Sequence, residues 1–267
     1  MKDRPVPQAE RIVGVPTEDT QIVHHVLREH DAEQGGALIE GLELEKNPRD
    51  LAIIATVQAG IANILNRYGR AVRAMPLERI HLLKIGGVGE QSDGKVSHGM
   101  NNWSTHSLLI DRDPSDVAFA TVLFHELTHA GSYAALQWTK ESTPRMAPYR
   151  QGFAVISRDG QRKYFKDLDE AVTQLLTKQF FAEMVLGNPD FDQADAADFV
   201  FTRQDEMNQL NALIDTLYMA HHEEFADREQ VESLFIRAHV NGNLLPVARL
   251  VERTLGPGSF RELGENT

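Results

Sequence analysis

The chain has 267 residues, 42% of them hydrophobic and 25% charged, which suffices for one large domain or two small ones around a sizeable core. Its formal net charge of −12 argues against nucleic acid as a partner, because phosphate binding depends on clustered Lys and Arg. The chain has no Cys, which excludes disulfides, thiolate metal sites and a Cys nucleophile.

The N-terminus and the most apolar window bear on location. Residues 1–5 lead into no apolar run, so no secretory signal is predicted. The most apolar window, residues 51–65, contains Thr56, Gln58 and Asn63. It is too short and too polar to span a membrane, which takes ~20 apolar residues. We therefore expect a cytoplasmic protein with no membrane partner.

Residues 1–46 are predicted to form a peripheral segment, because prolines, charges and paired glycines interrupt any long periodic pattern. Residues 17–40 have room for one helix. That helix would carry His24, His25 and His30, and a solvated helix face explains these imidazoles better than a metal site does.

The first clear helix begins at Asn47-Pro48, because Asn favours the N-cap and Pro the first helical position. Apolar residues then recur at helical spacing, and Gly69 ends the helix. Strands are predicted over residues 79–85 and 104–110, each bounded by turn residues.

A second helix is predicted to begin at Asp113-Pro114, again with an N-cap followed by Pro. Residues 117–124 run without a charge, which is typical of a helix that is buried on all sides. Gly131 is the predicted end of this helix.

The rest of the chain is predicted to be mostly helical. Residues 144–164 form a loop with a short strand at 153–157. Asp167 then caps a helix that runs to Leu186, and residues 188–267 contain further helices with one apolar face each.

The charge-free stretch of the second helix ends in the pattern HExxH, formed by His125-Glu126-Leu127-Thr128-His129. Residues four apart lie on one helix face, so both imidazoles can reach one zinc ion at about 2.0–2.1 Å. Glu126 lies near the open position of that metal, where it can take a proton from bound water. Buried polar groups cost about 1–3 kcal/mol unless satisfied, and a cation would satisfy these three. The alternative is a wet helix end at which all three side chains meet solvent.

Zinc in such a site takes a third protein ligand, which is His, Asp or Glu because the chain has no Cys. The best candidate is Glu170, on a separate helix that can pack against the first. An alternative stays open on residue chemistry alone. If Asp167 is the N-cap, Glu170 completes a capping-box-like pair at the helix start.

At these residues the chain resembles the gluzincin metallopeptidases, in which a Glu on the next helix joins the two His of HExxH. More narrowly, residues 125–130 (HELTHA) followed by 169–174 (DEAVTQ) resemble small, mostly uncharacterised bacterial gluzincin-like proteins. The second helix of those proteins carries the run Asn-Glu-Ala-Val-Thr-Glu. The likeness extends over about residues 41–264.

The resemblance implies a zinc metallopeptidase in which His125, His129 and Glu170 bind zinc and Glu126 is the general base. The substrate would be a peptide or protein, and an endopeptidase is expected rather than an exopeptidase. The oligomeric state is left open.

Two positions depart from the family run, because Asp169 stands in place of Asn and Gln174 in place of Glu. Neither is an expected ligand, so only a helper role for these side chains is in doubt. Such enzymes also place a hydrogen-bond donor opposite the general base to stabilise the oxyanion. Tyr164 is the candidate, with Tyr149 and Tyr133 as alternatives, and packing under a loop is an equal explanation for Tyr164.

The resemblance further implies an edge strand that pairs with extended substrate, here within residues 98–110. His98 and His106 in this stretch are interpreted as surface residues rather than spare ligands. The run at residues 221–224, His-His-Glu-Glu, is interpreted as a solvated helix face.

Two rival functions come from other classes. A di-iron carboxylate protein would use two Glu-x-x-His pairs, and Glu126 with His129 and Glu78 with His81 both have that spacing. The second pair lies in a strand-like run rather than a helix, which disfavours this class. A catalytically inactive binding or regulatory module that kept the helix is the other rival.

Together these patterns predict an α+β, mostly helical, zincin-like metallopeptidase domain with a small mixed β-sheet and extra C-terminal helices. The expected divisions are a peripheral segment over 1–46, a catalytic core over 47–187 and a helical subdomain over 188–267.

Overall fold

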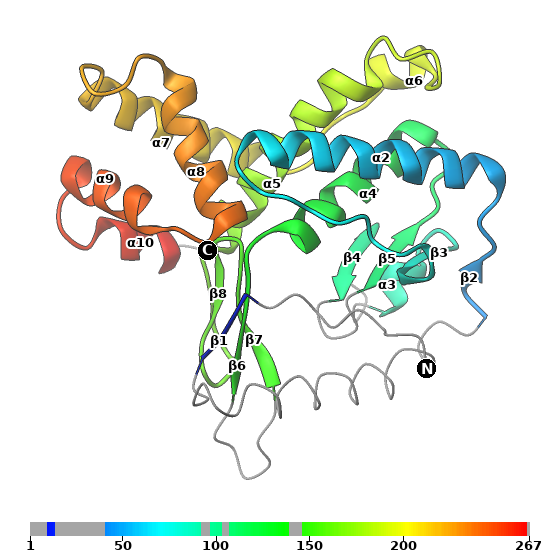
Figure 1. Cartoon of the computed structure of the whole chain (residues 1–267), viewed down its shortest axis with the longest axis horizontal. Coiled ribbons are helices and arrows are strands. Elements are labelled where there is room, and N and C mark those ends of the chain that lie inside the picture. Colours follow the sequence, from blue (N-terminus) through cyan, green and yellow to red (C-terminus); the bar gives the residue numbers. More distant parts are fainter. Residues whose placement is uncertain (1–9, 14–40, 92–96, 103–106, 139–145, 266–267) are drawn as a thin grey trace.

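The computed structural model describes residues 10–13, 41–91, 97–102, 107–138 and 146–265. Within these ranges the protein is mixed α+β and mostly helical, as predicted, but its strands form two small mixed sheets rather than the one expected. Figure 1 shows helix α2 (Pro48–Arg67) crossing above α4 (Asp116–Gly131), with the strands below.

A four-stranded sheet lies beside α4, in the order β2-β3-β5-β4. Strands β3 and β5 are parallel and the two outer pairs are antiparallel. The bounds are β2 Glu43–Leu44, β3 Ile80–Leu83, β4 Gly99–Asn102 and β5 Ser107–Asp111. The predicted strand over 79–85 is thus confirmed as β3, after a short 3-10 turn at Leu77–Arg79.

The predicted substrate-pairing strand within 98–110 is two strands rather than one. β5, which directly precedes α4, lies inside the sheet, and its antiparallel partner β4 forms the edge. His106 lies outside the described residues.

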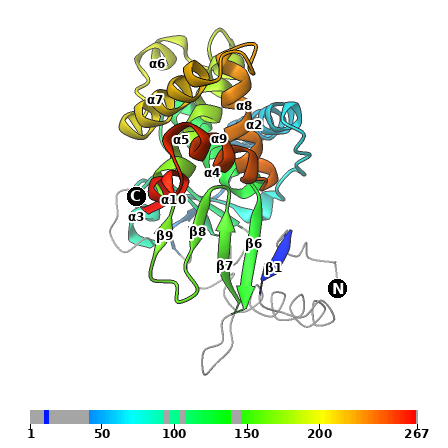
Figure 2. The same cartoon turned by 90° about the vertical axis from the view of Figure 1, so that its left-hand side faces the viewer.

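The second sheet has five strands in the order β1-β6-β7-β8-β9 and lies below the helices in Figure 2. Its bounds are β1 Arg11–Val13, β6 Ala134–Trp138, β7 Met146–Gln151, β8 Ala154–Ile156 and β9 Lys163–Tyr164. β1 pairs in parallel with β6, so the N-terminal segment is not wholly peripheral. The predicted helix over 17–40, with His24, His25 and His30, lies outside the described residues.

Helix α2 begins as predicted. The side chain of Asn47 accepts hydrogen bonds from the backbone amides of Arg49 and Asp50, and Pro48 occupies the first turn. Gly60 in the middle of α2 allows a close approach, because a Cβ there would lie 2.8 Å from the ring of Phe180. That ring stacks on Phe124 at 4.3 Å, so α2 packs tightly against the two helices that carry the site.

Helix α4 begins two residues later than predicted. Its N-cap is Ser115, whose Oγ accepts the backbone amide of Ala118 at 3.0 Å. The carboxylate of Asp113 instead accepts the amide of Ser115 at 2.8 Å, so it caps the turn rather than the helix. Gly131 is confirmed as the last residue of α4.

Helix α5 (Lys166–Phe180) also begins differently from the prediction. Its N-cap is Phe165, which has a left-handed backbone with φ 58° and makes no side-chain capping bond. Asp167 is therefore the second helical residue rather than the N-cap. A π-helical turn, Phe181–Val185, continues α5 to the end predicted for this helix.

The C-terminal helices share one continuous core with α2, α4 and α5, which includes Phe124, Phe180, Phe235 and Val251. Their bounds are α6 Gln193–Asp198, α7 Gln204–Ala220, α8 Arg228–Asn241, α9 Leu245–Leu255 and α10 Ser259–Glu265. A short helix, α3 (Gly87–Gln91), follows β3. No helix in the described part of the chain is long and apolar enough to cross a membrane.

Candidate metal centre

The two histidines of HExxH lie at the C-terminal end of α4, one turn apart. His125 and His129 turn their Nε2 atoms toward each other, 3.2 Å apart. Both imidazoles are partly buried, with 17% and 12% of the side chain exposed. The local geometry expected from the i, i+4 spacing is therefore present.

Glu170 completes the cluster from α5. Its Oε2 atom lies 3.3 Å from Nε2 of His125 and 3.8 Å from Nε2 of His129. It is the fifth residue of α5, and its carboxylate faces the imidazoles. The capping-box interpretation of Glu170 is therefore wrong, and of the two roles left open by the sequence the tertiary structure favours the ligand.

The three donor atoms fit a single small cation. Tetrahedral coordination with bonds of about 2.0–2.1 Å places neighbouring donors about 3.3 Å apart, close to the three separations between His125, His129 and Glu170. Two imidazoles and one carboxylate are also the ligand set of many catalytic zinc sites. Among the described residues, this is the one group of three His, Asp or Glu side chains that converges in this way.

The electrostatics of the cluster favour positive charge. Burial by itself lowers the pKa of His129, but hydrogen bonds to Asp169 and Glu170 outweigh it and hold that pKa well above its ordinary value. Burial likewise raises the pKa of Glu170, and the neighbouring His125 and His129 hold it far below its ordinary value. The raised pKa of His129 favours a proton on this ring in the metal-free cluster, and a bound cation would replace that proton.

Asp169, one of the two departures from the family run, supports the cluster from behind. Its Oδ2 atom lies 3.3 Å from Nδ1 of His129, which leaves Nε2 of that ring facing Glu170. A carboxylate on the far nitrogen of a ligating imidazole fixes the ring orientation and its tautomer. Asp169 therefore lies where it could orient His129, which is the kind of helper position that the sequence left in doubt.

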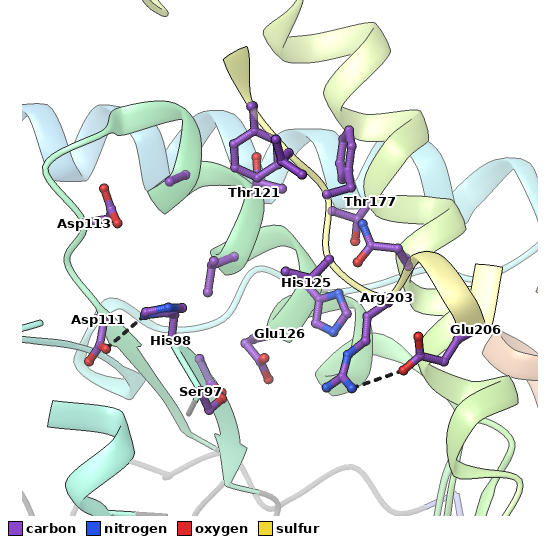
Figure 3. A pocket seen from close by; sticks show the side chains of 18 residues that line it. Ser97, His98, Asp111, Asp113, Thr121, His125, Glu126, Thr177, Arg203 and Glu206 are labelled. Atoms are coloured by element: carbon purple, nitrogen blue, oxygen red, sulfur yellow. Dashed lines mark hydrogen bonds and ion pairs between the residues drawn. The ribbon is translucent and has the colours of Figure 1, made fainter. Parts of the chain in front are cut away.

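A cleft of about 570 Å³ opens over one side of the cluster. Figure 3 shows His125 and Glu126 facing it, with His98 and Asp113 toward one end and Arg203 and Glu206 at the other. Gln174, the second departure from the family run, is buried and lines the same cleft.

Edge strand β4 forms the wall of the cleft next to the HExxH helix. A Cβ at Gly99 would lie 2.6 Å from Cγ and 2.9 Å from Oε1 of Glu126. The strand backbone thus approaches Glu126 closely because this residue is glycine. The resemblance implies that the strand before the active helix is the edge, but that strand is β5, which lies inside the sheet, and the strand that lies against Glu126 is β4.

Arg203 is a cleft residue that the sequence did not reveal. It precedes α7 and has a left-handed backbone with φ 61°, which is uncommon for a residue other than glycine. Its Nε atom lies 3.6 Å from Oε2 of Glu170, and its guanidinium also pairs with Glu206 at 3.3 Å. The left-handed turn holds a cation beside the cluster, and no local pattern in the sequence signals it.

Tyr164 does not line the cleft. It lies in β9, where it pairs with Val155 of β8. Of the two alternatives, Tyr133 packs its ring under Arg150 at 4.7 Å, and Tyr149 lies in β7. The structure therefore brings none of these three tyrosines to the candidate site.

The second Glu-x-x-His pair lies away from the cluster. Glu78 is in the 3-10 turn before β3, and His81 is in β3, where its Nδ1 lies 2.8 Å from a carboxylate oxygen of Glu43. A di-iron site needs this pair on a helix that faces the first pair. The structure therefore does not supply the second Glu-x-x-His pair that a di-iron carboxylate protein requires. His98 is largely exposed at the cleft rim and 3.4 Å from Asp111.

Comparison of the chain with protein-family models, with curated proteins and with solved structures found no match.

Proposed function

We propose that this chain is a zinc-dependent peptidase. The observation that carries the proposal is the convergence of three donors from His125, His129 and Glu170, beside an open cleft that His125 and Glu126 line. A closed four-ligand site would indicate a structural metal, whereas three protein ligands beside a cleft leave a coordination position for solvent.

Each part of the cluster has a chemical task in hydrolysis. When bound, zinc supplies a Lewis acid that acidifies water and polarises a carbonyl. The carboxylate of Glu126 faces the cleft, where it can accept a proton from the attacking water. As the water oxygen bonds to the carbonyl carbon and the C–N bond breaks, Glu126 returns that proton to the leaving nitrogen.

Arg203 is the group best placed to stabilise the oxyanion, in place of the tyrosine expected from the resemblance. Its guanidinium lines the cleft beside Glu170 and presents several N–H donors from one planar group. A cationic donor held beside the reacting centre stabilises negative charge as it develops on the carbonyl oxygen.

The cleft shape supports an extended peptide as substrate. Among the described residues, strand β4 is the outermost strand of its sheet, and a sheet edge of this kind can pair with a peptide in extended form. The cleft extends to both sides of Glu126, which supports cleavage within a chain rather than at its end. Val122 and Val200 line it, and Val200 is 82% exposed, so apolar substrate side chains fit this wall.

The zincin-like classification rests on the same elements. An HExxH helix (α4), a following helix with the third ligand (α5) and an edge strand beside the general base (β4) are the parts expected of such a domain. Their arrangement here supports the proposed class.

Metal analysis of the purified chain beside Glu170→Ala tests the metal centre. We expect about one zinc per chain, as the one convergent cluster among the described residues implies, and its loss from the variant. Digestion of a mixed library of synthetic peptides, read by mass spectrometry, tests the chemistry. Zinc binding without any cleavage would favour the inactive binding module, and iron in place of zinc would favour the metal carboxylate class.

A further inference from the structure

A histidine from the C-terminal helices lies directly behind the candidate metal centre. His239, near the end of α8, has no exposed surface, and its ring packs 6.3 Å from that of Phe153. Its Nδ1 atom lies 3.1 Å from Oδ1 of Asp169. Among the described residues, neither ring nitrogen has a hydrogen bond of good geometry. A buried imidazole with this single polar contact calls for an explanation, because burying an unsatisfied polar group is costly.

The carboxylate of Asp169 is held from two directions. On one side Oδ1 accepts the backbone amide of Phe153 at 2.7 Å and faces His239. On the other side Oδ2 faces Nδ1 of His129. The three side chains His239, Asp169 and His129 therefore form a row that leads from α8 through α5 to α4.

The surrounding backbone makes room for this row and holds it. A Cβ at Gly152 would overlap both Asp169 and the ring of His239. The guanidinium of Arg150 donates to the carbonyl oxygens of Ala238 and Gly242, at 3.2 and 2.7 Å, on either side of His239. The position of His239 is thus set by the sheet as well as by its own helix.

We propose that His239 is a positioning residue for a divalent-cation site. It holds the carboxylate of Asp169 against Nδ1 of His129 and thereby orients the ligating Nε2 of that ring. This inference rests on the proposed function, because it requires that His129 ligates a metal. Without the imidazole, Oδ1 keeps only its backbone amide donors, and the carboxylate is freer to turn away from His129.

The test is zinc affinity of the full-length chain, stripped of metal and titrated with zinc against a chromogenic chelator. Partners behind a ligating histidine typically change metal affinity by about 10–100-fold, and we expect a loss of that size for His239→Leu. His239→Asn should recover most of the loss, because its amide nitrogen stands near the position of Nδ1. Should His239→Leu fail to fold, His239→Gln serves instead, since its amide lies near Nε2 and away from Asp169.

Phe235→Leu is the matched control, because Phe235 is on the same helix, has no exposed surface and packs on the same Phe153 ring. We expect it to lower the thermal stability of the metal-free chain and to leave zinc affinity unchanged. In an Asp169→Ala background, His239→Leu should have no further effect on zinc affinity, which a merely structural role would not produce.

Two results would overturn the inference in different ways. Wild-type zinc affinity in His239→Leu, or an equal loss in Phe235→Leu, would refute the positioning role while leaving the metal centre intact. A wild-type chain that binds no zinc would refute the metal centre itself and this inference with it.

Discussion

Residues 125–129 and residues 221–224 both combine His and Glu at short spacing, but their side chains have different surroundings in the structure. In the cluster at 125–129, the ring nitrogens converge with Glu170 on one point beside a cleft. In the run at 221–224, after α7, the side chains already have other partners. Nδ1 of His221 lies 3.1 Å from Glu224, and its Nε2 lies 3.0 Å from the hydroxyl of Thr254.

The comparison of these two stretches indicates that a metal site needs more than residues of the ligand types. Both stretches place imidazoles and carboxylates close together in sequence. At the first, a second helix brings the carboxylate of Glu170 to the two imidazoles, and the three donors converge on one point. At the second, Glu224 pairs with Arg253 at 2.8 Å and half of its side chain is exposed. This supports the interpretation of residues 221–224 as a solvated face.

We expect the strongest loss of function when the cluster at 125–129 loses a ligand. His129→Ala removes one of three ligands, so we expect loss of both zinc and peptidase activity, measured by metal analysis and by digestion of the peptide library. His221→Ala is the matched change at the second stretch and should keep both. Zinc retained at wild-type affinity in His129→Ala would contradict the assignment.

Removal of the general base separates chemistry from binding. Glu126→Ala should keep zinc and lose turnover by about 10²–10⁴-fold, because proton transfer by a positioned side chain contributes that much. The measurement is zinc content beside kcat on a peptide that the wild-type chain cleaves. Full activity in this variant would end the proposed mechanism.

The oxyanion assignment predicts a smaller loss. Arg203→Met should lower kcat by about 10²–10³-fold with little change in KM, since the donor acts on charge that develops during reaction. Tyr164→Phe is the control and should leave kcat unchanged, because Tyr164 lies in β9 outside the cleft. Unchanged kcat in Arg203→Met together with a lowered kcat in Tyr164→Phe would favour Tyr164, the residue predicted from the resemblance, as the oxyanion donor.

The pH dependence of zinc binding tests the electrostatics of the cluster at 125–129. The pKa of His129 in the metal-free chain is held well above its ordinary value, so zinc must displace a proton there. Affinity should therefore rise with pH, by up to about tenfold per unit, until the pH passes that pKa. Titrations against a chelator at several pH values measure this slope, and a flat profile would contradict it.

The smallest effect belongs to the second stretch. His221→Ala removes two surface contacts, so we expect a loss of only about 0.5–1.5 kcal/mol in the free energy of unfolding, measured by urea denaturation. A change in zinc stoichiometry for this variant would show that the two stretches are more alike than their contacts indicate.

Parts of the candidate site could be predicted because they are local. The pairing of His125 with His129 follows from helical spacing, and the buried character of α4 follows from its charge-free run. Even local signals failed where two residues of similar chemistry competed. Asp113 and Ser115 are both good N-cap residues, and only the path of the chain decided for Ser115.

Other parts depend on contacts between distant segments. Arg203 and His239 lie 33 and 69 residues beyond Glu170 in the numbering, and no periodicity marks them. Tyr164 is only six residues before Glu170 in the sequence, but it lies in strand β9 and does not line the cleft. Nearness in sequence is therefore a poor guide to nearness in space where a strand is followed directly by a helix.

The mixed α+β class, the helix start at Asn47 and the HExxH pair could be predicted from the sequence, because each depends on neighbours within one or two turns of chain. Contacts between distant segments place Glu170 opposite the two imidazoles, make β4 rather than β5 the edge, and bring Asp169 and His239 behind His129. These outcomes depend on how α5 and α8 pack against α4. That packing is set by the summed burial of a core drawn from the whole chain, which no short stretch encodes.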